Sequence, residues 1–477
     1  MPTPRVAPYG SWESPIRSDL IASASIALGA VAVSNSAVYW LEGRPTEGGR
    51  SVLVKRTADG TVTDVTPQGF NVRTLVHEYG GGAFWLHGDT VFFTNFADQR
   101  LYRQDPGDEP RPITPEPPAP RSLRYADGCV TPDDRLIICV QEEHAPDGQV
   151  HNRLVALPAD GSAEPRIIAE GHDFYSFPRV SPDGTRLVWT TWDHPRMPWD
   201  GTDLWVGTLN QDSTLSDVLH VAGGPEESIF QPAWSPDGTL HLISDRTGWW
   251  NLYALKDGEL IPLAPMDAEF GVPQWVFGLT TYDFLQDGRI ACLYSQRGLT
   301  HLGVITPGSG RVEPVETSFT AFRSIRTAPA GDQVWVIAAS ASHPASVASI
   351  DLQTGNATVV RKSLDVDLDP GYLSIPEPIE FPTDGGLTAH ALFYRPANRD
   401  FIGPEGERPP LLVLSHGGPT GQTTSALNLE IQFWTSRGFA VVDVNYGGST
   451  GYGRAYRERL KGNWGIVDVA DCVNAAR

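Results

Sequence analysis

The chain has 477 residues, of which 40% are hydrophobic and 19% charged, and these proportions exclude long disordered regions. Its 57 acidic residues outnumber its 36 basic residues and give a formal net charge of −21, opposite in sign to what a nucleic acid or an anionic membrane would bind. The four cysteines are too few and too scattered for a disulfide framework, so we expect a reducing, cytoplasmic environment.

No membrane or targeting segment is predicted near the start of the sequence. The most apolar early stretch, residues 21–33, is interrupted by serines and is shorter than the roughly 20 residues that span a bilayer. No basic region leads directly into it, as a signal peptide would require. We expect residues 1–24 to form an N-terminal segment that packs on the C-terminal domain.

A repeated turn signal marks residues 25–370. The clearest copies, of the type Ser-Pro-Asp-Gly, lie at 131–134, 181–184 and 235–238, and weaker ones surround Asp287 and Asp332. The aspartates of these five turns are 45 to 54 residues apart, and two earlier turns near residues 35 and 89 extend the series to seven. Each marker precedes a short β-rich run, a polar turn and a second such run.

This repeat has the size of one propeller blade. Proline presets the first turn angle, aspartate bonds the local backbone and glycine accepts a positive φ, a combination that suits tight connections between antiparallel strands. About fifty residues accommodate four strands with their turns. Residues 25–370 are therefore predicted to form a β-propeller of about seven blades with TolB- or WD40-like repeats; the alternative is a pair of β-sandwiches.

The pattern changes in residues 371–477. Residues 411–415 form a continuous apolar run typical of a strand buried on both faces, residues 427–437 look helical, and residues 439–445 form a second buried run. Strand, helix and strand in this order predict a parallel sheet with a crossover connection.

A glycine turn, His416-Gly417-Gly418-Pro419, follows the first of these strands. In α/β-hydrolases such a turn lets a backbone N–H face the acyl carbonyl and forms part of the oxyanion hole. His416 and Gly417 are therefore our oxyanion-hole candidates, and residues 371–477 are predicted to be the N-terminal, incomplete part of an α/β-hydrolase domain. Gly-Gly-Pro also occurs as an ordinary exit from a strand.

Further motifs accompany this turn along nearly the whole chain. They include HEYGGG at 77–82, SDRTGWWN at 244–251, NYGGSTGYGR at 445–454 and GNWG at 462–465. Together with the predicted propeller they resemble the prolyl oligopeptidase family of serine peptidases, in particular its dipeptidyl-aminopeptidase and acylaminoacyl-peptidase branch. The resemblance implies hydrolysis of short peptides or N-terminal aminoacyl bonds, with the propeller screening out large folded substrates.

One string departs from the hydrolase pattern. Residues 447–451 read Gly-Gly-Ser-Thr-Gly, which matches the nucleophile elbow Gly-x-Ser-x-Gly, but the last histidine of the sequence is His416. The order nucleophile, acid, histidine cannot be completed after Ser449, so we interpret this stretch as a loop. We expect the catalytic triad after Arg477, and we expect these 477 residues alone to be inactive because no general base can activate the serine.

An exopeptidase also needs an anion for the free ammonium group of its substrate. Glu226 and Glu227, which precede a predicted strand, are the favoured candidates, and Glu78 is the next; each could equally be a solvated loop acid. Arg454 could bind a substrate carbonyl or carboxylate, or could form a salt bridge within its domain.

No metal or cofactor is predicted, because residues 77–82 complete neither an HExxH motif nor a phosphate loop. Short peptides are the expected partners. Two other functions stay open: a non-catalytic propeller that binds peptides or proteins, and an esterase that uses the same oxyanion turn.

Overall fold

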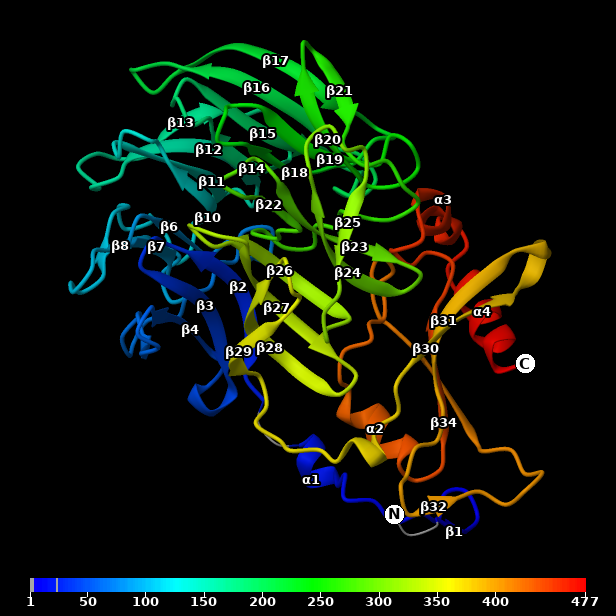
Figure 1. Ribbon diagram of the computed structural model, residues 1–477. Coiled ribbons are helices and arrows are strands. Elements are labelled where there is room, and N and C mark those ends of the chain that lie inside the picture. Colours follow the sequence, from blue (N-terminus) through cyan, green and yellow to red (C-terminus); the bar gives the residue numbers. More distant parts are fainter. Residues whose placement is uncertain (1–3, 23–24) are drawn as a thin grey trace.

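The computed structural model describes residues 4–22 and 25–477, so parts of the predicted N-terminal segment, residues 1–3 and 23–24, lie outside it. In the described residues, seven four-stranded antiparallel sheets follow one another between Ala27 and Lys362, and each consists of four consecutive strands. They form the blue-to-yellow body of Figure 1, beside which the orange and red C-terminal part lies. Local hairpins repeated in this way are consistent with a β-propeller.

The first four sheets cover the chain from Ala27 to Gly223. The first sheet contains β2 (Ala27–Val33), β3 (Ala37–Arg44), β4 (Arg50–Thr57) and β5 (Val62–Asp64), and the second β6 (Phe84–His87), β7 (Thr90–Thr94), β8 (Leu101–Gln104) and β9 (Arg111–Pro112). The third contains β10 (Leu123–Val130), β11 (Leu136–His144), β12 (Val150–Pro158) and β13 (Arg166–Ala169), and the fourth β14 (Phe174–Val180), β15 (Arg186–Trp192), β16 (Asp203–Leu209) and β17 (Leu215–Gly223).

The last three sheets repeat the arrangement. They consist of β18 (Ile229–Trp234), β19 (Leu240–Ser244), β20 (Asn251–Lys256) and β21 (Glu259–Pro262); of β22 (Tyr282–Phe284), β23 (Ile290–Gln296), β24 (Leu299–Ile305) and β25 (Val312–Val315); and of β26 (Ala321–Thr327), β27 (Gln333–Ser340), β28 (His343–Asp351) and β29 (Ala357–Lys362). A short 3₁₀ turn, η1 (Pro45–Glu47), interrupts the first sheet.

The repeated turn signals connect the first and second strands of their sheets. In the turn between β14 and β15, Ser181 Oγ donates to Asp183 Oδ1 (2.5 Å), Thr185 N donates to the same oxygen (3.1 Å), and Gly184 has a φ of 74°. The turn between β18 and β19 repeats these bonds around Asp237. The hairpins predicted from the repeat are confirmed at these positions.

The first strands of several sheets share a feature that no sequence motif marks. β2, β10, β14 and β18 each contain a bulge with one non-glycine residue at positive φ: Ala30 (39°), Asp127 (55°), Phe177 (52°) and Gln231 (46°). Side chains at these positions also join neighbouring sheets, because Asp127 accepts from Phe177 N and Gln231 accepts from Thr281 N, both at 2.7 Å. The first strands thereby line a common interior space.

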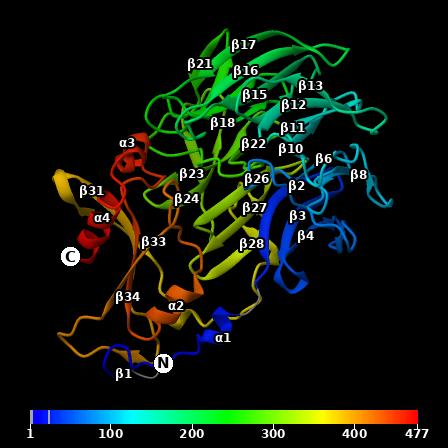
Figure 2. The ribbon, with the colours of Figure 1, turned by 180° about the vertical axis from the view of Figure 1, so that it is seen from behind.

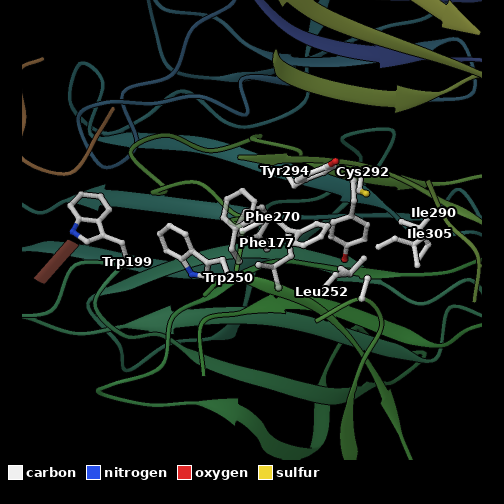
Figure 3. Close-up of a cluster of buried hydrophobic side chains, with 14 residues drawn as sticks. Phe177, Trp199, Trp250, Leu252, Phe270, Ile290, Cys292, Tyr294 and Ile305 are labelled. Carbon is white, nitrogen blue, oxygen red and sulfur yellow. The ribbon is translucent and has the colours of Figure 1, made fainter. Parts of the chain in front are cut away.

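Side chains packed between neighbouring sheets form the core. Figure 3 shows a cluster between the fifth and sixth sheets in which buried side chains such as Phe270, Cys292 and Ile305 lie together. Another cluster joins the first sheet to the seventh, where Arg361 also pairs with the buried Glu42 at 2.7 Å. The first and last sheets therefore meet through side chains.

The C-terminal part contains a mixed sheet in the order β30 (Glu377–Pro382), β31 (Thr388–Tyr394), β34 (Ala440–Asn445) and β33 (Leu411–Ser415). β33 and β34 are parallel, and α2 (Leu429–Thr435) lies in the crossover between them, as the sequence predicts. The helix begins later than predicted because Asn428 caps its start and accepts from Glu430 N at 2.9 Å, and it ends at Thr435. Four further short elements are η2 (Pro370–Tyr372), η3 (Asp384–Gly386), α3 (Arg454–Arg457) and η4 (Glu458–Leu460), and the last helix is α4 (Val467–Ala476).

The described part of the N-terminal segment lies against this C-terminal part. β1 (Arg5–Val6) pairs with β32 (Phe401–Ile402), and α1 (Ser18–Ile21) lies beside α2 in both Figure 1 and Figure 2. The hydroxyl groups of Ser14 and Ser436 are hydrogen-bonded to each other at 2.7 Å. Among residues 4–22 and 25–477, no helix is long and apolar enough to cross a bilayer.

Candidate active site

The glycine turn after β33 presents two unused backbone donors. Gly417 and Gly418 are exposed, and among the described residues neither backbone N–H donates a hydrogen bond to another protein group. Residues 411–415 form β33, but the strand is only partly buried and not buried on both faces as predicted. The two free N–H groups at its end can donate to an anionic or carbonyl oxygen. His416, Gly418 and Tyr446 line an open pocket of about 720 Å³ here, together with residues of α4.

The contacts of His416 select one neutral tautomer of its ring. Its Nδ1 lies 2.9 Å from the carbonyl oxygen of Gly417, and its Nε2 lies 2.7 Å from Ser449 Oγ. Burial lowers the pKa of His416, so the ring is neutral near pH 7. Because a carbonyl can only accept, Nδ1 carries the proton and Nε2 accepts the proton of the Ser449 hydroxyl. The ring also stacks on Tyr446, with 4.6 Å between ring centroids.

The contact between His416 and Ser449 has the polarity of a base and a nucleophile, but Ser449 is fully buried, with 0% of its surface exposed. It lies in the turn after β34, where its backbone N–H donates to the Tyr446 carbonyl at 2.9 Å. No atom of a substrate could reach Oγ without displacing the surrounding loop. In this geometry the serine hydroxyl orients His416.

A second, larger cavity lies among the seven sheets and reaches the C-terminal part. It has a volume of about 890 Å³ and is lined by first strands of the sheets and by Gly421, Gln422, Thr424 and Thr450 of the C-terminal part. Trp275 closes one side, where its Nε1 donates to the Thr420 carbonyl at 2.6 Å. The cavity is therefore adjacent to the loop that follows the glycine turn.

None of the three glutamates singled out from the sequence lines this cavity. Glu226 is exposed, and Glu227 accepts from Ser244 Oγ at 2.6 Å and pairs with Arg246 at 3.2 Å. Glu78 shares Arg124 Nη1 with Glu142, at 3.0 and 2.9 Å. Their assignment to the substrate ammonium stays a prediction.

Glu78, Glu142 and His144 bring possible metal-ligand atoms within 4.8 Å of one another. The guanidinium of Arg124 already bonds both carboxylates and His144 Nε2 lies 2.7 Å from Glu142. The position that a cation would take between the carboxylates is thus held by a protein cation.

Arg454 contacts the sheets as well as its own domain. Its Nη1 lies 2.7 Å from Asp245 Oδ2, which also binds Arg457 Nη2 at 2.6 Å, and its Nε pairs with Glu458 at 3.0 Å. Asp245 lies in the SDRTGWWN motif, but its partners are 209 and 212 residues away, so sequence inspection assigned it no role.

Glu269 is one of two carboxylates, with Asp127, that the structure places in the cavity wall. It accepts from the backbone N–H groups of Trp250 (2.7 Å) and Gly453 (3.1 Å) and lies 3.8 Å from Arg457 Nη1. Burial raises its pKa to about 7, although Arg457 and the two amides act in the opposite direction. In the sequence it follows Asp267 by two residues in a mostly apolar stretch, and no motif marks it.

Antiparallel repeats followed by an α/β part with a free donor turn are typical of a two-domain hydrolase. The family model described as Prolyl oligopeptidase family matches residues 425–477. A puromycin-hydrolyzing peptidase of Mycobacterium tuberculosis is 39% identical with a TM-score of 0.91, over 99% of this chain and 74% of that one. A crystal structure of puromycin hydrolase is 40% identical with a TM-score of 0.90 over the same shares, and so is its serine-to-alanine mutant complexed with PGG. The chain belongs to the prolyl oligopeptidase family.

Matches to curated relatives are shorter. The uncharacterized peptidase YuxL of Bacillus subtilis is 35% identical over 104 residues, which are 22% of this chain and 15% of that protein. The acylamino-acid-releasing enzyme of Sus scrofa is 36% identical over 107 residues, 22% of this chain and 14% of the enzyme. The matched region thus spans about a seventh of the length of these two relatives.

Proposed function

We propose that this chain belongs to a serine-type peptidase that hydrolyses short peptides or N-terminal aminoacyl bonds, including the aminoacyl amide of puromycin. Its similarity to the puromycin-hydrolysing structures over 99% of its length supports the substrate class. The observation that carries the chemistry is the pair of free N–H groups at Gly417 and Gly418, which can hold the oxyanion of acyl transfer.

In this proposal the seven sheets are the blades of a seven-bladed propeller, and residues 371–477 belong to an α/β-hydrolase domain. The 890 Å³ cavity between them is the substrate chamber. A chamber of this size admits short peptides and excludes folded proteins, which accounts for the propeller's role in selecting substrates.

The catalytic serine, acid and histidine are proposed to lie outside these 477 residues. Two observations support this assignment: Ser449 is fully buried, and no histidine follows it. We therefore expect the 477-residue chain to bind peptides without cleaving them. The burial of Ser449 thus favours, for these residues alone, the second candidate function, a non-catalytic peptide-binding propeller. The four cysteines are free in the structure, in keeping with a proposed cytoplasmic location.

A substrate panel tests the proposed activity. The longest product of the gene is assayed with puromycin, with aminoacyl and dipeptidyl p-nitroanilides, with an acylaminoacyl p-nitroanilide and with p-nitrophenyl esters. Cleavage of at least one of these amides that a serine-directed inhibitor abolishes supports the peptidase. Cleavage of the esters alone contradicts it.

A further inference from the structure

The wall of the central cavity carries more positive than negative charge. Six charged residues line it: Arg73, Arg179, Arg323, Arg326, Asp127 and Glu269. The whole chain has a formal net charge of −21, so four guanidinium groups gathered around one interior space run against its general charge balance. Such a local excess indicates an anionic ligand.

Both carboxylates of the wall are already engaged. Asp127 Oδ1 pairs with Arg179 Nη2 at 2.7 Å, and Asp127 Oδ2 accepts from Phe177 N at 2.7 Å. Glu269 accepts from two backbone N–H groups on its two oxygens. Neither acid is therefore available to neutralise Arg323 or Arg326.

Arg326 has donors to spare. Among the described residues its guanidinium makes one hydrogen bond, from Nη1 to the carbonyl of Ile325 at 3.2 Å, and no ion pair. Burial lowers the pKa of Arg326, the nearby Asp283 raises it, and the nearby Arg179 lowers it. The guanidinium of Arg326 stays protonated, as arginine does in proteins. Asp283 is itself engaged by Thr327 N at 2.8 Å. Arg326 is partly buried and forms no ion pair among the described residues, so its remaining N–H groups can pair with a ligand carboxylate.

Arg323 adds a second free cation. It lies in the bulge of β26 between Phe322 and Ser324, it is exposed to the cavity, and it makes no hydrogen bond or ion pair with another described side chain. Two guanidinium groups on one strand can receive a carboxylate with several N–H donors, the geometry that arginine forms best.

We propose that Arg326 and Arg323, with Arg179 beside them, bind the C-terminal carboxylate of a short peptide inside the cavity. This inference rests on the proposed function, because the opposite wall contains Gly421, Gln422 and Thr450, next to the glycine turn where the acyl carbonyl would bind. We expect a peptide of a few residues to reach from that turn to the arginines, and a long chain to leave its carboxylate outside. The arginines thus select for short substrates with a free C-terminus.

The test measures binding without turnover. The 477-residue chain is titrated calorimetrically with Pro-Gly-Gly and with Pro-Gly-Gly amide, which differ only in the C-terminal charge. We expect the free acid to bind about tenfold to a hundredfold more tightly than the amide, the difference typical of charge-assisted hydrogen bonds. Arg326→Gln and Arg323→Gln are each expected to weaken binding of the acid and to leave the amide unchanged.

Two further variants separate recognition from folding. Arg326→Lys keeps the charge and is expected to retain part of the preference, and Arg311→Gln alters an exposed arginine outside the cavity and is expected to change nothing. Equal binding of acid and amide, no binding of either, or an equal loss for both peptides in Arg326→Gln would overturn the proposal. Hydrolysis of short peptides without a preference for the free acid would leave the proposed function standing and refute this inference alone.

Discussion

At the scale of single residues, the free N–H of Gly417 is the group most directly tied to the proposed chemistry. Gly417→Pro removes this donor, and in the active peptidase we expect kcat to fall about 100- to 1000-fold with a smaller change in KM, since the oxyanion forms only during the reaction. Gly417→Ala is the matched control because it keeps the N–H and its added Cβ meets no atom within 4 Å. Similar activity of the two variants would contradict the assignment.

Glu269 makes stability depend on pH. Its pKa is raised from an ordinary value of 4.5 to about 7, so between these values the folded chain holds a proton that the unfolded chain has lost. The stabilisation is complete below pH 4.5 and is lost as the pH rises through 7, with a size on the order of 3 kcal/mol.

Glu269→Gln cannot lose this proton, so we expect its free energy of unfolding in urea to decrease less between pH 5 and pH 8 than that of the unmodified chain. Glu226→Gln, at an exposed position, should keep the original dependence. An unchanged pH dependence in Glu269→Gln would show that another group is responsible.

At the scale of elements, the turns between first and second strands fix where the first strand of a sheet ends and the second begins. Gly184 has a φ of 74°, and a Cβ there would meet no atom closer than 3.6 Å, so the cost of Gly184→Ala is one of backbone conformation. We expect a loss of about 1 kcal/mol in the free energy of unfolding. Gly184→Asn should lose less because asparagine tolerates this region; a loss as large as that of alanine would contradict the explanation.

These same turns show why part of the fold could be predicted. Proline, aspartate and glycine act within four residues, so the local sequence predicts the hairpin between β14 and β15. The apolar runs of β33 and β34 likewise predict two strands. The bulges at Asp127 and Phe177 could not be predicted, because their positive φ values belong to the packing of neighbouring sheets and to no local motif.

At the scale of the whole molecule, the glycine turn could be predicted from the sequence, but the long-range contacts around the cavity could not. Asp245 binds Arg454 across 209 residues, and Glu269 binds Gly453 across 184. Arg179 of the fourth sheet and Arg326 of the seventh line the same cavity because the sheets place their first strands around it. Contacts that depend on how the sheets come together have no fixed spacing in the sequence, so no motif predicts them.

The most direct test of the central claim compares hydrolysis of puromycin and of aminoacyl p-nitroanilides by the 477-residue chain and by the longest product of its gene, each with and without Ser449→Ala. We predict that only the longer product is active and that Ser449→Ala does not abolish its activity, since we propose that the buried hydroxyl orients His416 and does not attack the substrate. Hydrolysis by the 477-residue chain that disappears in Ser449→Ala would contradict this reading and identify Ser449 as the nucleophile.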